Sequence, residues 1–139
     1  MPILMRNKFV IRMVGSLWTS PNTLLGLLIG FAGLTAPRAE CGVINFYWHK
    51  GPVHSVVRRR GISAFTMGDC VIYLVPPTQN LRVHEGRHVA QYHALGPLFL
   101  PAYFLLMAFF GYHDHPLETD AYEHEQSVCG FSGPTEIPR

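Results

Sequence analysis

Two uncharged apolar stretches dominate the pattern of hydrophobic and polar positions along the chain. The first occupies residues 17–36 and the second residues 95–112. A helix needs roughly 20 apolar residues to cross a bilayer, whereas runs of 10–14 residues are typical of buried or interfacial helices. The pattern therefore predicts one or two apolar helices, with either a membrane or a protein core as their surroundings.

The first stretch has the features of a helix that begins near Pro21. Gly26 and Gly30 have the spacing that small residues use for close helix contact in membranes. Basic residues upstream would favour a cytoplasmic N-terminus if the helix crosses a bilayer. No cleavage site follows the apolar run. We therefore expect residues 1–16 to form a basic N-terminal segment and residues 17–36 to form a retained apolar helix, either a membrane anchor or a core helix.

The segment between the apolar stretches has a different periodicity, with many β-branched and aromatic residues separated by glycine and proline. Such runs are typical of short strands and turns. The basic run Arg58–Arg60 is expected at an exposed strand end or turn, where it is available to anionic lipid head groups. The sequence predicts a small antiparallel sheet of three or four strands, within residues 42–48, 53–60, 62–67 and 71–75.

The clearest candidate chemistry lies in an HExxH sequence that begins at His84. After His88 the helical pattern continues without glycine or proline to residue 95, so residues 81–95 are predicted to form one helix. His84 and His88 are four residues apart and therefore lie on one helix face, at a separation suited to one Zn²⁺. Glu85, on the same turn, is placed to take a proton from a zinc-bound water.

A catalytic zinc site usually has a third protein ligand and leaves one position for water. A histidine six residues after His88 would complete one common pattern, but residue 94 is alanine. A glutamate on a second helix is the other common solution, and Pro116 is suited to the start of such a helix. We expect Glu118 to be the third ligand, with Ala121 small enough to let the two helices approach. The competing candidates are His115, Glu123 and His124.

HEGRHVAQY and the later HPLETDAYE together resemble the gluzincin class of zinc metallopeptidases, particularly its short, single-domain minigluzincin type. The resemblance covers residues 81–125. It implies that His84, His88 and Glu118 bind zinc and that Glu85 is the general base. A zinc cofactor and a peptidase activity follow from this resemblance as expectations.

Residues near the predicted ligands are candidates for supporting roles. Members of the class with the E-x-x-A pattern often have Asp or Asn after the alanine, whereas this chain has Tyr122. Asp120 would orient a ligand imidazole, or else act as a solvated acid at the start of its helix. Tyr122, His124 and His93 are candidates for stabilising an oxyanion.

The second apolar stretch, residues 95–112, directly connects the two halves of this candidate site. A full membrane crossing there would place His88 and Glu118 on opposite sides of a bilayer, which a shared metal ion forbids. Pro97 and Pro101 also interrupt the stretch. We expect a helix that packs against the domain or dips into the membrane surface and then folds back.

Composition narrows the possible functions. The 139 residues suffice for one domain, and we expect a metal-binding domain in residues 37–126 and an irregular tail in residues 127–139. A net charge of +2, without a known nucleic-acid motif, argues against a nucleic-acid partner. The three widely spaced cysteines predict neither a disulfide framework nor a zinc–cysteine module.

These features predict an α+β fold in which a small antiparallel β-sheet accompanies the HExxH helix, the glutamate helix and one or two apolar helices. The expected function is that of a zinc-dependent hydrolase, a small membrane-associated metallopeptidase that acts on a peptide or protein with zinc-bound water as nucleophile. The first alternative is a non-catalytic metal-binding protein at a membrane, and the second is a scaffold with incidental histidines. The expected location is a membrane, with the active domain in the cytoplasm, and a soluble cytoplasmic protein is the alternative.

Overall fold

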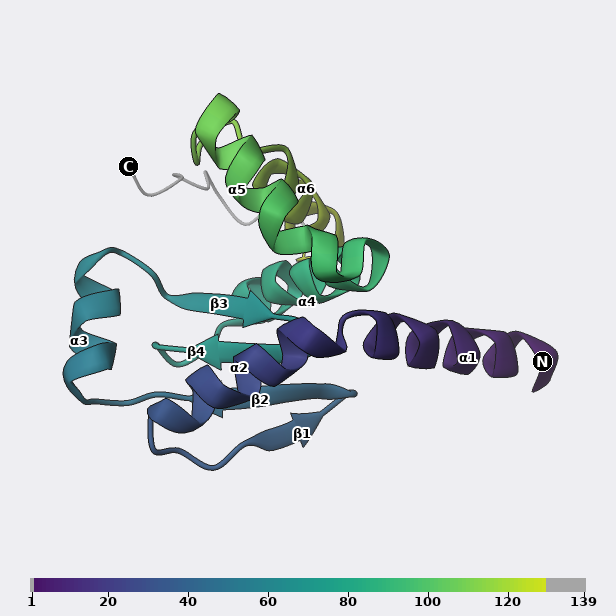
Figure 1. Ribbon diagram of the computed structural model, residues 1–139, viewed down its shortest axis with the longest axis horizontal. Coiled ribbons are helices and arrows are strands. Elements are labelled where there is room, and N and C mark those ends of the chain that lie inside the picture. Colours follow the sequence, from purple (N-terminus) through teal and green to yellow (C-terminus); the bar gives the residue numbers. More distant parts are fainter. Residues whose placement is uncertain (1, 130–139) are drawn as a thin grey trace.

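The computed structural model describes residues 2–129, which form helices around a four-stranded sheet (Figure 1). Of the irregular tail expected in residues 127–139, residues 127–129 are helical instead, and the remainder lies outside the described residues. The predicted α+β class is confirmed. A short 3-10 helix, Gly96–Leu98, joins the HExxH helix to the next one. The helices are α1 (Pro2–Trp18), α2 (Ser20–Ala32), α3 (Pro52–Arg59), α4 (Gln79–Leu95), α5 (Phe99–Phe110) and α6 (Pro116–Cys129), and the strands are β1 (Arg38–Glu40), β2 (Val43–Tyr47), β3 (Ala64–Met67) and β4 (Cys70–Tyr73).

The sheet is mixed rather than wholly antiparallel. Its strands lie in the order β1-β2-β4-β3, so that β1 and β3 form the two edges. The outer pairs are antiparallel, as expected, but the central strands β2 and β4 are parallel, with Phe46 opposite Ile72. The parallel pairing arises because α3 and β3 intervene between β2 and β4, and parallel strands require such a crossover connection.

Residues 53–60, expected as a strand, are mainly helical and belong to α3. Pro52 lies in the first turn of α3, where its missing N–H does not matter. Arg58 and Arg59 lie in the last turn, where positive charge complements the helix dipole. The partial alternation of this segment is also compatible with helical spacing, and Val57 packs against the core. The basic run therefore ends a helix instead of a strand.

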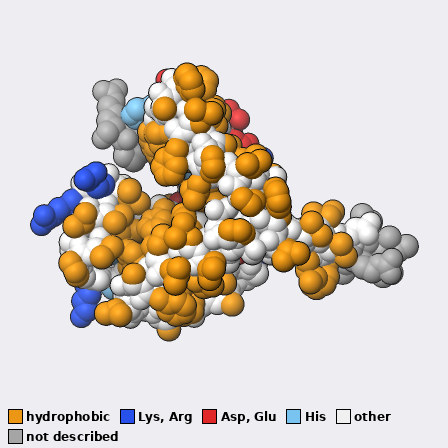
Figure 2. All heavy atoms as spheres, in the orientation of Figure 1, with side chains coloured by type: hydrophobic (Ala, Val, Ile, Leu, Met, Phe, Trp, Pro, Cys, Tyr) orange, Lys and Arg blue, Asp and Glu red, His pale blue; other side chains and the backbone are white. Residues whose placement is uncertain are grey.

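Exposed apolar side chains are spread over α1, α2 and α5 on the face that Figure 2 shows. One continuous helical run, Gln79–Phe110, is long and apolar enough to cross a membrane by length and composition, and only 11% of its most apolar window is buried. The helix in the first apolar stretch, α2, has 13 residues and is shorter than the expected helix over residues 17–36. The described residues therefore include apolar helical surface that the fold itself leaves uncovered.

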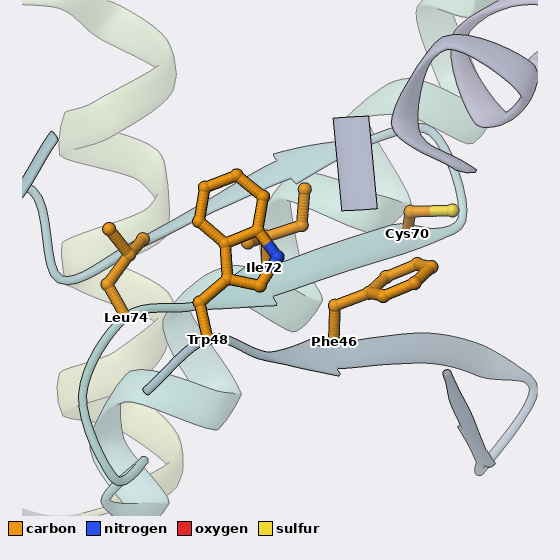
Figure 3. Close-up of a cluster of buried hydrophobic side chains, with 5 residues drawn as sticks. All are labelled: Phe46, Trp48, Cys70, Ile72 and Leu74. Carbon is orange, nitrogen blue, oxygen red and sulfur yellow. The ribbon is translucent and has the colours of Figure 1, made fainter. Parts of the chain in front are cut away.

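Helix α2 covers one face of the sheet closely because two glycines, Gly30 and the capping Gly33, present no side chain there. A Cβ at Gly30 would lie 2.4 Å from the Phe46 ring, and a Cβ at Gly33 would lie 2.0 Å from Trp48 Nε1. Trp48 Nε1 donates a hydrogen bond of 3.1 Å to the Gly30 carbonyl. The glycine spacing that suggested contact between membrane helices thus serves contact with the sheet. The buried cluster beneath α2 consists of Phe46, Trp48, Cys70, Ile72 and Leu74 (Figure 3).

Helix α4 packs on the opposite face of the sheet. Alternate residues of a strand point to opposite faces, so Val71 and Tyr73 of β4 point away from α2 and contact Val89 of α4. The Tyr92 hydroxyl on α4 donates to the Thr66 carbonyl on β3 at 3.1 Å. Helix α6 packs against α4, and α5 connects the two. The HExxH helix therefore lies between the sheet and the predicted glutamate helix.

The contact between α2 and the sheet predicts opposite effects for two glycine-to-alanine substitutions. Gly30→Ala should lower the free energy of unfolding by about 1–3 kcal/mol, because the Phe46 ring is buried and cannot move aside easily. Gly86→Ala is the matched control, since a Cβ at Gly86 meets nothing within 4 Å. It should raise that free energy by up to about 1 kcal/mol through helix propensity. Chemical denaturation of both variants measures the difference, and equal effects would contradict the packing described.

Candidate metal centre

Three predicted ligands come together at the interface of α4 and α6. His84 Nε2 lies 3.3 Å and His88 Nε2 lies 3.5 Å from Glu118 Oε2, and the two Nε2 atoms are 3.2 Å apart. Ligands that lie 2.0–2.1 Å from a tetrahedral ion are about 3.3 Å from one another. The spacing of these three donor atoms therefore fits a tetrahedral metal ion, and this buried group could hold one.

The convergence follows from local features of the two helices. Thr78 caps α4 by accepting a hydrogen bond from the Leu81 amide at 3.2 Å, which starts the helix a turn before His84. The four-residue spacing then places both imidazoles on the side of α4 that faces α6. On α6, Ala121 is completely buried, so the two helices approach closely beside Glu118. The small residue has the role that the sequence predicted for it.

A side-chain amide orients His88. Gln91 Oε1 lies 2.9 Å from His88 Nδ1, while Gln91 Nε2 donates to the Leu117 carbonyl at 2.9 Å and to Asp120 Oδ2 at 2.8 Å. Because the amide nitrogen has two acceptors, the amide oxygen faces the imidazole and accepts its Nδ1–H. The tautomer with a free lone pair on Nε2 is thereby favoured, as a metal ligand requires.

Asp120 therefore acts on the imidazole through Gln91 and not by direct contact. Its carboxylate also pairs with Arg87 on α4, with Arg87 Nε 2.7 Å from Asp120 Oδ2. This hydrogen bond stabilises both charges, because it lowers the pKa of Asp120 and raises that of Arg87. The pair links α4 to α6 beside the ligands.

A second carboxylate lies behind His84. Glu125 Oε2 is 3.3 Å from His84 Nδ1, an ion-pair distance, although Nδ1 is buried without a hydrogen bond in this arrangement. The Tyr122 ring, 4.5 Å from the His84 ring between centroids, covers the same imidazole. Ligand histidines commonly donate their second N–H to a carboxylate. Glu125 is placed to be that acceptor, although the sequence did not suggest it as a supporting residue.

Glu118 is fixed from the other side by Tyr103 of α5, whose hydroxyl donates to Glu118 Oε1 at 2.7 Å. Burial alone would raise the pKa of Glu118, but the hydrogen bonds from His84, His88 and Tyr103 outweigh it and hold that pKa well below its usual range. Burial would likewise lower the pKa of His88, yet Glu118 and Glu85 raise it to about 9. In the metal-free protein, His88 and Glu118 therefore form a buried ion pair.

The predicted general base, Glu85, is buried beside this cluster. Its Oε2 accepts a hydrogen bond of 2.6 Å from the Thr66 hydroxyl on β3. Burial raises the pKa of Glu85, against the opposing effects of His88, of the Thr66 hydrogen bond and of His84. A carboxyl group whose pKa is raised toward neutrality can accept a proton and give it back.

The other predicted candidates lie in different surroundings. His93 pairs with Asp69, at 2.5 Å between Nε2 and Oδ1. His115 is buried, with its ring nitrogens near the Tyr103 carbonyl and the Leu117 amide. Glu123 is exposed. Within residues 2–129, the group suited to a metal comprises only His84, His88 and Glu118, so His124 is not part of it.

Four supporting residues were missed by the sequence reasoning. Two of them had a usable signal: Gln91 lies one turn after His88, and Glu125 lies two turns after Glu118 on the same face of α6. The others, Thr66 and Tyr103, come from different elements. Their contacts with Glu85 and Glu118 depend on tertiary packing, which no spacing in the sequence predicts.

Comparisons with protein-family models, with curated proteins and with solved structures found no match to this chain.

The buried ion pair predicts how the stability of the metal-free protein depends on pH. The pKa of His88 is raised from 6.5 to about 9 in the folded protein, so its protonated form stabilises the fold fully below pH 6.5 and progressively less as the pH rises through 9. The lowered pKa of Glu118 keeps its carboxylate charged across this whole window.

We therefore expect the free energy of unfolding to fall between pH 6.5 and 9 by on the order of 1–3 kcal/mol. Denaturant titration in the presence of a chelator measures this change. His88→Gln should show a clearly smaller decrease over the same range, because it has no proton to lose. Equal pH dependence of the two proteins would contradict the ion pair.

The Gln91 network predicts a loss of metal affinity without loss of a ligand. Gln91→Ala should weaken zinc binding by roughly 10–100-fold, because His88 loses the acceptor that orients it. Gln79→Ala, at the exposed start of α4, is the control and should leave the affinity unchanged. Competition with a chromophoric chelator gives both affinities, and an unchanged affinity for Gln91→Ala would show that the amide has no such role.

Proposed function

We propose that this protein is a zinc-dependent hydrolase, a small metallopeptidase of the gluzincin type that acts on a peptide or protein. The observation that carries the proposal is the 3.2–3.5 Å spacing of the His84, His88 and Glu118 donor atoms. Two imidazoles and one carboxylate are the ligand set of many catalytic zinc sites, in which the fourth position is left for water. The buried carboxyl group of Glu85 beside them adds the proton acceptor that hydrolysis needs.

In this mechanism, a bound zinc ion would polarise the substrate carbonyl and make a water molecule acidic enough to lose its proton near neutral pH. Glu85 accepts the proton of the attacking water and returns it to the leaving nitrogen. The hydrogen bond from Thr66 holds the Glu85 carboxyl group in one orientation. Gln91 and Tyr103 hold the ligands His88 and Glu118, so that little reorganisation is needed during the reaction.

For the oxyanion, Tyr122 is a better candidate than His124. The Tyr122 ring contacts the ring of His84, and its hydroxyl hydrogen-bonds with Tyr112. The position of His124 offers no comparable contact with a ligand. A phenol beside the metal can donate its proton to a developing negative charge on the substrate.

Strand β3 offers a way to hold an extended peptide. It lies at the edge of the sheet and pairs only with β4 among the described strands. Thr66 of β3 contacts Glu85, so this strand runs directly beside the proposed base. Main-chain pairing of a peptide with a sheet edge is a common mode of recognition. The Thr66 carbonyl already accepts from Tyr92, so a peptide would pair with the other residues of β3. Such pairing would align a peptide bond for cleavage and would depend little on which side chains the peptide carries.

One observation favours a second function, that of a non-catalytic metal-binding protein. The three ligand residues are each only 6% exposed, and a further acidic residue, Glu125, lies behind His84. Structural zinc sites are closed by protein ligands, whereas catalytic sites remain open to water. A protein of this second kind would bind one metal ion per chain and cleave no peptide.

We further propose that the protein is membrane-associated, with its metal-binding domain in the cytoplasm. Helices α2 and α5 contain no charged residue. Lys8 and Arg12 of α1 precede α2, and positive charge before an apolar helix favours the cytoplasmic side. A soluble cytoplasmic protein is the alternative, and fractionation of cells that produce the full chain separates the two.

The proposed role of Glu85 predicts a separation of metal binding from turnover. Glu85→Gln should retain one zinc ion per chain, because the ligands and the Thr66 hydrogen bond remain. It should lose peptide cleavage by roughly 10²–10⁴-fold, because an amide cannot accept the proton. Glu123→Gln, an exposed acid on α6, is the matched control and should keep both properties. Metal analysis and a peptide-library assay measure them, and undiminished cleavage by Glu85→Gln would refute this mechanism.

A further inference from the structure

Helices α2 and α5 both lie on the face of the molecule that Figure 1 shows, and apolar side chains are exposed over both of them in Figure 2. Neither helix contains a charged residue. Their large exposed apolar residues, each 41–77% exposed, form what we call the α2/α5 face together with Leu98 just before α5. The face consists of Leu24, Leu25, Leu28, Phe31, Leu98, Phe104, Leu105, Phe109 and Phe110.

The inner sides of both helices are already occupied. Helix α2 contacts the sheet through Gly26 and Gly30. Helix α5 contacts the rest of the site through Phe99, which stacks on Tyr92, and through Tyr103, which donates to Glu118. The α2/α5 face is therefore a surface that neither helix needs for folding, and exposed apolar area of this extent is typical of a binding surface.

Helix α5 by itself is too short to cross a membrane, and the part of the helical run that precedes it carries the two histidines of the candidate metal centre. The 12 residues of α5 span about 18 Å, whereas the hydrocarbon core of a bilayer is about 30 Å thick. The chain reverses after α5 at Gly111, whose φ is +70°. Helix α6 then returns to α4, and the Arg87–Asp120 ion pair joins the two. An apolar helix held in this way can insert into one leaflet, with its axis along the membrane surface.

We propose that the α2/α5 face docks on one leaflet of an anionic lipid bilayer, so that the metal centre, directly behind α5, is held at the membrane surface. This inference deepens the membrane association proposed above and does not depend on hydrolysis. Because Tyr103 connects α5 to Glu118, the metal site lies one helix away from the lipid. Polypeptide segments that lie on or emerge from the bilayer are then the substrates within its reach.

The distribution of charge favours lipid over a second copy of the chain. Basic side chains lie at the edge of the apolar side in Figure 2, and Arg58, Arg59 and Arg60 come from the end of α3. The acidic residues of α6 lie behind α5. Two partly exposed aromatic residues lie nearby: Trp18 is the last residue of α1, and Tyr112 follows α5. An apolar surface with basic and amphipathic aromatic residues at its margins matches the interface of an anionic leaflet.

Flotation of the full chain with lipid vesicles tests this inference. The wild-type protein should float with phosphatidylcholine vesicles and several-fold more strongly with vesicles that also contain phosphatidylglycerol. The double variant Leu28→Asp/Phe104→Asp should lower the lipid partition coefficient by at least about tenfold. Both side chains are more than 60% exposed, so the variant should fold. Zinc stoichiometry and circular dichroism of the variant check that the metal centre and the fold are intact.

Val56→Asn is the control, because Val56 is similarly exposed but lies on α3, outside the α2/α5 face, and a neutral side chain leaves the charge beside Arg58 unchanged. It should change the partition coefficient by less than about twofold. Equal flotation of the wild type and the double variant would overturn the inference. A wild-type dimer that does not float, and that the double variant converts to a monomer, would show that the face binds a second copy. Neither result would affect the proposed hydrolase, which metal content and peptide cleavage test separately.

Discussion

Two imidazoles and one carboxylate are held together out of water, and much of the fold follows from this constraint. Buried polar and charged groups cost several kcal/mol each unless they are paired. His84, His88 and Glu118 satisfy one another in the metal-free chain through the ion pair at the interface of α4 and α6. A divalent cation at their centre would replace mutual pairing by three ligand bonds, so metal binding and folding are linked at this interface.

The surrounding residues connect this cluster to every element that packs on it. Gln91 joins His88 to α6, Tyr103 joins Glu118 to α5, and Thr66 joins Glu85 to the edge of the sheet. Each contact limits a different side chain to one orientation, which is what a preorganised site requires. The two sides of the apolar helix α5 therefore differ: its inner side fixes a ligand through Tyr103, and its outer side is left uncovered by residues 2–129.

The HExxH helix and Glu118 could be predicted because helical spacing and the start of α6 at Pro116 are local properties of the sequence. Residues 53–60 were predicted wrongly as a strand, since a partial alternation of apolar residues fits both periods and only tertiary packing selects the helix. The parallel pairing of β2 with β4 and the contacts of Thr66 and Tyr103 depend on elements distant in sequence. Strand β1 was missed because its three residues are all exposed and show no buried pattern.

Anomalous diffraction at the zinc absorption edge, from crystals of the full chain grown with zinc, would locate the metal ion. We expect one strong peak per chain, about 2.0–2.2 Å from Nε2 of His84, Nε2 of His88 and the carboxylate of Glu118. A peak bound by other side chains, or no peak between α4 and α6, would contradict this expectation.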